Sequence, residues 1–323
     1  MGFLPHARQF PAWRAPEITA SAPCIALDSD AALTIGTRTS IAQHGELLQG
    51  QMQDDQHRYR RFLISLPCDR LHTTVTFVPD MGGVLTVEPA YKSKVQKVVK
   101  LTLERFGIFH MGGLITVKSN IPEGKGYGSS TADCIAGARA AADAVAGTLT
   151  DEEVAQVVVS AEIASDSFMF NRAVLFAHRE GIVLSEFGPR LPRFEVLGID
   201  MDVAGVVHTL EYPPAIYDWR QIQYFQILVA AAERAIRRGD LALLGRVATS
   251  SAVINQQFLP KPMFSELCRL MESAHALGVA VAHSGTVLSI LFDPSELRIE
   301  TNIRQAYRDL ETLGITDVLR FQT

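Results

Sequence analysis

The segment from Pro122 to Ala132 carries the most distinctive chemistry of the chain. Its glycines stand at alternate positions and hydroxyl side chains follow them; the candidate ligand-binding residues are Pro122, Gly124, Lys125, Gly126, Gly128, Ser129, Ser130 and Thr131. Glycine allows positive φ and a close approach of the backbone to an anion. An alanine-rich helix is expected next, and the free N–H groups and dipole at a helix start favour bound phosphate. The segment therefore predicts a phosphate-binding loop.

Two familiar phosphate-binding motifs do not fit this segment. A P-loop reads G-x-x-x-x-G-K-[ST], whereas Lys125 precedes the last glycine. A dinucleotide-binding fingerprint reads G-x-G-x-x-G within a β-α-β unit, whereas the glycines here follow G-x-G-x-G. The remaining alternative is a simple flexible turn. Pro122 and the two serines at the expected helix start argue against it.

Two carboxylates, Glu162 and Asp166, follow downstream and are four residues apart. This spacing puts both on one helix face or at a helix end. Phosphoryl transfer to an alcohol needs one carboxylate to hold Mg²⁺ and one to accept the proton of the hydroxyl. The alternative is an exposed acidic helix face, against which the apolar run 168–170 argues.

The elements that must position these residues alternate irregularly. Residues 1–30 show no clear period, and the polar run over 49–61 is expected to form a hairpin tip or a loop. Strands are expected over 33–48, 62–66, 71–78, 84–87, 114–117, 194–199, 203–207, 279–283 and 287–293. Helices are expected over 91–107, 129–145, 150–164, 217–238, 241–257, 262–276 and 303–313. Thr150 and Glu153 predict a capping box at the start of the helix expected over 150–164. The lack of a strict β-α-β rhythm favours an α+β fold.

The composition is that of an ordinary folded protein of 323 residues with a formal net charge of −5. Mild acidity argues against nucleic acid as a partner, because such a surface needs a basic stripe. No run of about eighteen apolar residues is present, which argues against a membrane span. The first residues lack the apolar core of a secretory signal.

The four cysteines are far apart and form no C-x-x-C pair; they are Cys24, Cys68, Cys134 and Cys268. This spread favours reduced thiols over a disulfide framework or a zinc site. We therefore expect a cytoplasmic protein.

The glycine-rich segment resembles the second motif of the GHMP kinases, named for galactokinase, homoserine kinase, mevalonate kinase and phosphomevalonate kinase. That motif reads Pro, three residues, then Gly-x-Gly-Ser-Ser-Ala, and Thr131 stands at the usual Ala. The resemblance implies a GHMP kinase-like two-domain α+β fold. It implies an extension over residues 1–37, a ribosomal protein S5-like ATP-binding domain over 38–190, and a ferredoxin-like domain over 191–323.

The resemblance also implies ATP and Mg²⁺ as cofactors. Ser130 and Glu162 would ligate the metal, and Asp166 would be the catalytic base. The sequence Gln43–Gly50 looks like the first motif of the family, but Ser40 stands where mevalonate kinase has a lysine, with Arg38 nearby.

Six residues are candidates for binding the substrate: His44, Glu46, Arg172, His283, Ser284 and Gly285. Arginine suits a substrate carboxylate because it can bind both oxygens. Each candidate has a plainer interpretation. Glu46 would be a solvated loop carboxylate, His44 and His283 core histidines, and Arg172 a surface charge.

The His-Gly-Glu-Leu-Leu-Gln-Gly stretch together with the late Ala-His-Ser-Gly-Thr-Val stretch is similar to the L-threonine kinase branch of the cobalamin pathway. This implies phosphorylation of a small hydroxy amino acid. Alternatives are another hydroxy compound, such as serine, homoserine or a secondary-metabolite alcohol, or a non-catalytic nucleotide-binding sensor. A homodimer is left open.

Overall fold

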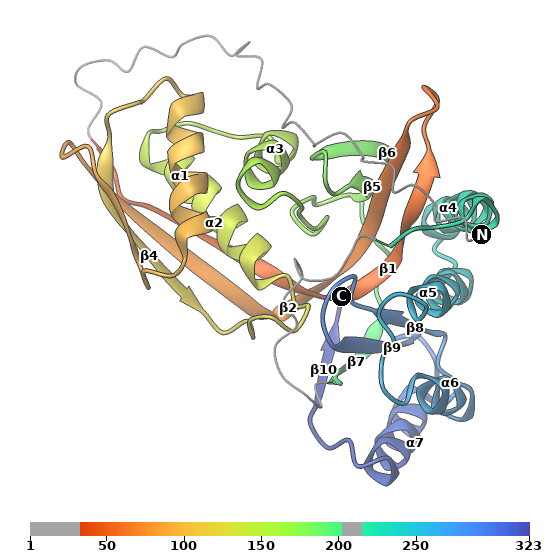
Figure 1. Cartoon of the computed structure of the whole chain (residues 1–323). Coiled ribbons are helices and arrows are strands. Elements are labelled where there is room, and N and C mark those ends of the chain that lie inside the picture. Colours follow the sequence, from red (N-terminus) through yellow and green to blue (C-terminus); the bar gives the residue numbers. More distant parts are fainter. Residues whose placement is uncertain (1–32, 202–214) are drawn as a thin grey trace, which may run out of the picture.

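The computed structural model describes residues 33–201 and 215–323. The irregular stretch expected over 1–30 and the strand expected over 203–207 lie outside the described residues. Within them, the chain forms one ten-stranded sheet with helices packed against it (Figure 1).

A long hairpin runs through the N-terminal half. β1 (Gly36–Gln53) and β2 (Tyr59–Asp80) pair antiparallel along most of their length. The predicted loop over 49–61 and the predicted break between 66 and 71 are therefore wrong in extent, since β1 reaches Gln53 and β2 is continuous. The pairing contains register shifts, one of them between Ile41 and Ala42, where β-bulges interrupt the regular ladder. The two strands continue to pair on both sides of each shift.

The rest of this half extends the sheet at the edge of the hairpin and covers one of its faces with helices. β4 (Gly112–Ser119) pairs antiparallel with β2 and parallel with β3 (Leu85–Glu88). The helices α1 (Ser93–Arg105), α2 (Ser129–Ala144) and α3 (Asp151–Glu162) pack together on this face (Figure 1). α2 is buried nearly all round, because its alanines let α1 and α3 approach on both sides.

The predicted capping box at Thr150 is confirmed. The Glu153 backbone N–H donates to Thr150 Oγ1 at 3.2 Å, and the Thr150 N–H donates to the Glu153 carboxylate at 2.8 Å. The cap fixes where α3 begins. α3 ends at Glu162, and Ile163 then adopts a left-handed conformation with φ of 77°.

Two strands follow that the sequence reading missed, β5 (Ala173–Ala177) and β6 (Ile182–Gly188). They form a short antiparallel hairpin that joins the sheet through Leu63 of β2. β5 is buried on both faces, so it shows no polar–apolar alternation that would mark it as a strand.

The described residues of the C-terminal half form four antiparallel strands and four helices. The strands are β7 (Glu195–Asp200), β8 (Gly278–Val281), β9 (Val287–Phe292) and β10 (Val318–Gln322). The helices are α4 (Trp219–Arg238), α5 (Leu241–Asn255), α6 (Phe264–Ser273) and α7 (Ile299–Thr312). The strand order β10-β7-β9-β8 places the fourth strand beside the first and the third beside the second, which is the ferredoxin-like arrangement. The predicted fold class is confirmed, although the sequence reading missed β10.

The two halves share the sheet, because β1 pairs with β8 where Glu46 lies opposite Val281. One hydrophobic cluster spans this junction and includes Leu47 and Phe62 from the hairpin and Phe225 from α4. The expected domain boundary at 190/191 falls in the connection between β6 and β7.

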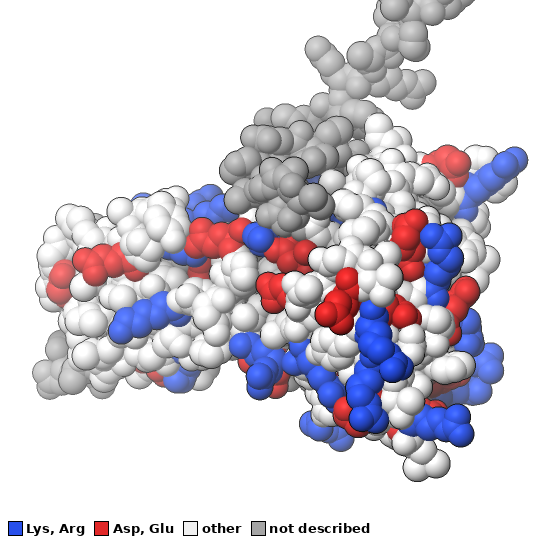
Figure 2. Space-filling model, turned by 90° about the horizontal axis from the view of Figure 1, so that it is seen from below, with Lys and Arg blue, Asp and Glu red and all other residues white. Residues whose placement is uncertain are grey.

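Charged residues of both signs are interleaved over the face drawn in Figure 2, at the end of the molecule formed by C-terminal elements. Ion pairs link charged residues of this half; Arg320, for example, bridges Glu195 and Glu300. In the described ranges, no helix is long and apolar enough to span a bilayer.

Candidate active site

A cavity of about 380 Å³ opens between the glycine-rich segment, the end of α3 and the turn between β8 and β9. All of the predicted loop residues except Lys125 line it. Glu162, Asp166, His283 and Ser284 line it as well, so residues from widely separated parts of the sequence meet there.

The glycine-rich segment has the conformation that its glycines predict. Gly124, Gly126 and Gly128 have φ of 72°, 97° and 70°, a region that other residues adopt only under strain. A Cβ added to Gly126 would lie 2.6 Å from the Ser284 carbonyl oxygen. Glycine at this position therefore lets the loop pack directly on the β8–β9 turn.

Lys125 holds the loop in place instead of facing the cavity. Its carbonyl accepts hydrogen bonds from the N–H groups of Thr286 and Val287 at 2.8 and 3.3 Å. Its Nζ donates to Asp200 Oδ2 at 2.6 Å, at the end of β7. These contacts fix the loop to the C-terminal half, which argues against a simple flexible turn.

The start of α2 faces the cavity. Gly128 precedes the helix in a left-handed conformation, and a Cβ there would lie 2.9 Å from Asp166 Oδ2. Ser129, Ser130 and Thr131 form the first turn and line the cavity. The first N–H groups of a helix have no partner within it, so this end can bind anionic oxygens.

Ser130 and Glu162 form the acidic end of the cavity. The Ser130 hydroxyl donates to Glu162 Oε1. Lys94 Nζ donates to Ser130 Oγ at 3.2 Å and to Glu162 Oε1 at 3.1 Å. The other oxygen, Glu162 Oε2, is buried and has no hydrogen-bond partner among the described residues. A hydroxyl and a carboxylate oxygen of this kind fit Mg²⁺, which takes few protein ligands besides phosphate oxygens and water.

Asp166 is half-buried at the cavity wall, beside the start of α2. Burial raises the pKa of Asp166 to about 7, and the charge of Glu162 adds to this effect. Hydrogen bonds from Thr131 and Gln43 act in the opposite direction. A carboxylate with a pKa near 7 can accept a proton and release it again at neutral pH.

Glu46 does not line the cavity. It is 1% exposed and lies on β1 at the pairing with β8. Burial raises its pKa well above the usual value, and the nearby charge of Asp166 raises it further. Its position supports an indirect influence on Asp166 more than a contact with substrate.

His44 is also a core residue. The Ser289 hydroxyl donates to the His44 carbonyl and therefore accepts from Nδ1, both at 2.8 Å. The Tyr127 ring packs edge-on at 5.0 Å, and a Cβ on Gly198 would lie 2.4 Å from Nε2. Burial lowers the pKa of His44 to about 4, so the ring is neutral. These contacts correspond to the core-histidine interpretation.

Arg172 lies outside the cavity. Its guanidinium pairs with Glu152, with Glu186 at 2.9 Å and with Asp151 at 3.8 Å, and so joins α3 to β6. It faces a separate hollow of about 240 Å³. Its position does not support the predicted contact with a substrate carboxylate.

His283 does line the cavity, and its tautomer follows from Gln49. The Gln49 amide donates to the Val281 carbonyl at 3.2 Å, so its oxygen accepts from His283 Nδ1 at 2.8 Å. The Nε2 atom of His283 therefore carries a lone pair while the ring is neutral. Burial lowers the pKa of His283 to about 4.

Gly285 shapes the turn that the glycine-rich segment packs against. A Cβ on Gly285 would lie 2.4 Å from the Lys125 carbonyl oxygen. Its own carbonyl accepts a hydrogen bond from Lys261 Nζ at 2.6 Å. Lys261 is 6% exposed, and burial lowers its pKa to about 8.

The cavity residues that sequence reasoning missed include Gln43, Lys94, His178 and Arg179. Lys94 belongs to a helix with several lysines, and nothing in the sequence distinguishes the one that reaches the carboxylate. His178 and Arg179 lie in the turn between two strands that the sequence reading also missed.

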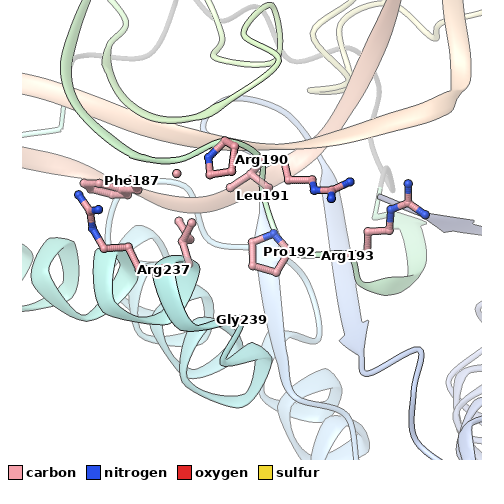
Figure 3. A pocket seen from close by; sticks show the side chains of 10 residues that line it. Phe187, Arg190, Leu191, Pro192, Arg193, Arg237 and Gly239 are labelled. Carbon is pink, nitrogen blue, oxygen red and sulfur yellow. The ribbon is translucent and has the colours of Figure 1, made fainter.

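A larger cavity of about 550 Å³ lies where the β6–β7 connection meets the end of α4. Figure 3 shows Arg190, Leu191, Pro192 and Arg193 on that connection and Arg237 on the helix. None of the predicted site residues lines this cavity. Among the described residues, its lining combines arginines with apolar side chains and includes no carboxylate, a group that phosphoryl transfer needs.

Comparison with known proteins gives two family matches. Residues 93–171 match the model of the GHMP kinases N terminal domain, and residues 232–309 match that of the GHMP kinases C terminal. Two relatives are named L-threonine kinase. The protein from Salmonella typhimurium is 31% identical over 277 residues, which are 80% of this chain and 84% of the relative. The protein from Citrobacter freundii is 35% identical over 192 residues, 55% of this chain and 62% of the relative.

Solved structures share the fold at low identity. Homoserine kinase from Cytophaga hutchinsonii matches with a TM-score of 0.62 and 15% identity, over 89% of this chain and 94% of that chain. Mevalonate kinase from L. major, solved in complex with R-mevalonate, matches with a TM-score of 0.58 and 16% identity, over 90% of this chain and 94% of that chain.

Proposed function

Because the chain belongs to the GHMP kinase family, and is thus an ATP-dependent small-molecule kinase, we propose that it phosphorylates the hydroxyl of L-threonine. The product would be O-phospho-L-threonine. The names of the relatives support this acceptor. One structural observation carries the catalytic part of the proposal: a helix N-terminus and two separate carboxylates, Glu162 and Asp166, meet in one cavity.

In the proposed step, the acceptor hydroxyl oxygen bonds to the γ-phosphorus of ATP. The bond between that phosphorus and the β–γ bridging oxygen breaks, and ADP leaves. Asp166 accepts the hydroxyl proton, and its pKa near 7 suits that task. The side chain of Asp166 lies beside Gly128, and groups bound at the start of α2 are therefore within its reach.

The phosphates of ATP would bind the N–H groups of the glycine-rich segment and of the first turn of α2. The residues proposed to contribute N–H groups are Gly124, Gly126, Gly128, Ser129 and Thr131. Pro122 has no N–H and would contribute to the shape of the loop. Lys125 would contribute only through its backbone, since its side chain bonds to Asp200.

Ser130 and Glu162 would hold Mg²⁺, which, when bound, neutralises charge on the phosphate oxygens. The unpartnered Glu162 Oε2 supports this assignment. Lys94 places a positive charge at the same point. The proposed location is the cytoplasm, where ATP and free amino acids occur together.

Purified protein with Mg-ATP tests the proposal directly. L-Threonine should give stoichiometric ADP and a phosphomonoester detectable by ³¹P NMR, with a higher kcat/KM than L-serine or L-homoserine. A higher kcat/KM for one of those alcohols would replace L-threonine as the acceptor. ATP binding without ADP release across the panel would favour the non-catalytic sensor instead.

A further inference from the structure

One part of the active-site cavity is cationic and has no function in the step described above. Arg179 lines the cavity from the turn after β5. Its Nε is buried and has no hydrogen-bond partner, and no carboxylate in the described ranges forms an ion pair with it. A buried guanidinium donor without a partner is costly unless a ligand satisfies it.

Several neighbours of Arg179 add positive charge or neutral nitrogen atoms, and the adjacent Glu180 pairs with Arg60 at 3.5 Å. The rings of His178 and His283 stack edge-to-face at 5.0 Å, and both nitrogens of His178 are buried without a partner among the described residues. The positive charges of Arg179, Arg61 and Lys261 all act on His283 and lower its pKa, after the larger effect of burial. This region therefore attracts an anion, and its imidazoles can exchange hydrogen bonds with a polar ligand.

The same turn is connected to the segment that carries Asp166. The Ser165 N–H donates to the His178 carbonyl at 2.9 Å, which ties the residue before Asp166 to the residue before Arg179. Asp166 and Arg179 are therefore held on adjoining parts of one cavity wall. A ligand with a hydroxyl and an anionic group on neighbouring carbons could face both.

We propose that Arg179 binds the carboxylate of the acceptor and so selects hydroxy acids over simple alcohols. This inference rests on the proposed function, because it concerns the acceptor of that reaction. It reassigns to Arg179 the contact that the sequence suggested for Arg172, whose guanidinium pairs with three acids. The fork of an arginine can bind both carboxylate oxygens, whereas a lysine offers one point charge.

The phosphates of ATP are the other anions that Arg179 could meet. They already have the start of α2, and Lys94 supplies a cation beside Ser130 and Glu162. The test must therefore separate acceptor from nucleotide.

The experiment compares L-threonine with L-threoninol, which lacks the carboxylate, in wild type, Arg179→Gln and Arg179→Lys. For Arg179→Gln, the kcat/KM for L-threonine should fall about 10- to 100-fold, while the KM for ATP stays within about twofold. Activity toward L-threoninol should be equally low in wild type and variant, because removing either partner loses the same interaction. Arg179→Lys should recover only part of the loss. Arg246→Gln, an exposed arginine on α5, is the matched control.

Equal losses on L-threonine and L-threoninol would overturn the inference, as would a rise confined to the KM for ATP. If wild type turns over another hydroxy acid instead of L-threonine, the same comparison is made between that acid and its analogue without the carboxylate. The inference about Arg179 is thus tested separately from the identity of the acceptor. If no acceptor is turned over, calorimetry of L-threonine binding in the presence of a non-hydrolysable ATP analogue decides. Binding that Arg179→Gln abolishes supports the subsite, and binding that it leaves unchanged, or no binding to wild type, rejects it.

Discussion

Ser130 and Glu162, 32 residues apart in the sequence, share a hydrogen bond, and Lys94 donates to both of them. The three side chains come from α2, α3 and α1, so the packing of these helices creates the acidic end of the cavity. Neither oxygen would lie there without the alanine-rich contact between the helices.

Glu162→Gln should weaken the response to Mg²⁺. The amide keeps the shape but loses the charge that favours the metal, so the Mg²⁺ concentration for half-maximal rate should rise about tenfold or more. Rates of ADP release over a Mg²⁺ series at fixed ATP measure this. Glu104→Gln, which replaces a carboxylate on α1 that pairs with Lys100, is the control. Superimposable Mg²⁺ curves for Glu162→Gln and wild type would remove Glu162 from the metal site.

Asp166→Asn should lower kcat by on the order of 10²–10⁴ if Asp166 is the base. The base must be ionised, and its pKa is about 7, so the wild-type kcat/KM should rise with pH and level off above pH 7. The residual activity of the variant should lack this ascending limb. A pH–rate profile between pH 5 and 9 measures both effects, and an unchanged limb in the variant would assign it to another group.

The same pKa has a consequence for stability. The folded-state pKa of Asp166 is raised from 3.8 to about 7, so the folded protein binds more protons than the unfolded chain between these values. Stability contributed by this group is therefore lost as pH rises from about 4 to 7. At pH 8 the free energy of unfolding of Asp166→Asn, measured by chemical denaturation, should exceed that of wild type by roughly 1–3 kcal/mol, because solvent in the cavity reduces the full effect of the pKa shift. At pH 4 this difference should be smaller. A constant difference across pH would contradict the shift.

Gly126→Ala should damage the loop more than an ordinary glycine replacement. Gly126 and Gly239 both have positive φ, of 97° and 67°. A Cβ on Gly126 meets the Ser284 carbonyl oxygen at 2.6 Å, whereas a Cβ on Gly239 meets nothing within 4 Å. Both variants should lose about 1 kcal/mol to backbone strain, and Gly126→Ala should lose more and raise the KM for ATP several-fold. Equal unfolding midpoints and equal KM for ATP would show that the close approach has no importance.

Ser289→Ala tests the core role of His44. The variant leaves the buried Nδ1–H of His44 without its acceptor, which should cost roughly 1–3 kcal/mol. The KM for the acceptor should not change in the folded enzyme, because His44 does not line the cavity. Chemical denaturation and steady-state kinetics on the same preparation measure both. A large rise in the acceptor KM with unchanged stability would instead support the predicted substrate contact.

The phosphate loop, the capping box and the pair Glu162 and Asp166 could be predicted because each depends on local sequence. Gly128 must adopt a left-handed conformation, and the helix start that follows exposes N–H groups wherever it lies. The third helix begins at a cap that two side chains specify. The strand β5 could not be predicted as readily, because it is buried on both faces and so has no polar–apolar alternation.

The sequence by itself thus determined the family resemblance, the phosphate loop and the carboxylates, since these depend on residue types at fixed spacing. Only the tertiary structure decided which other polar residues reach the cavity. His44 and Arg172 carry suitable groups, but packing buries one against Ser289 and ion pairs hold the other outside. Arg179 carries the same group as Arg172 and faces the cavity, because the β5–β6 turn is tied to the loop before Asp166. Contacts between distant segments set these directions, and no local spacing encodes them.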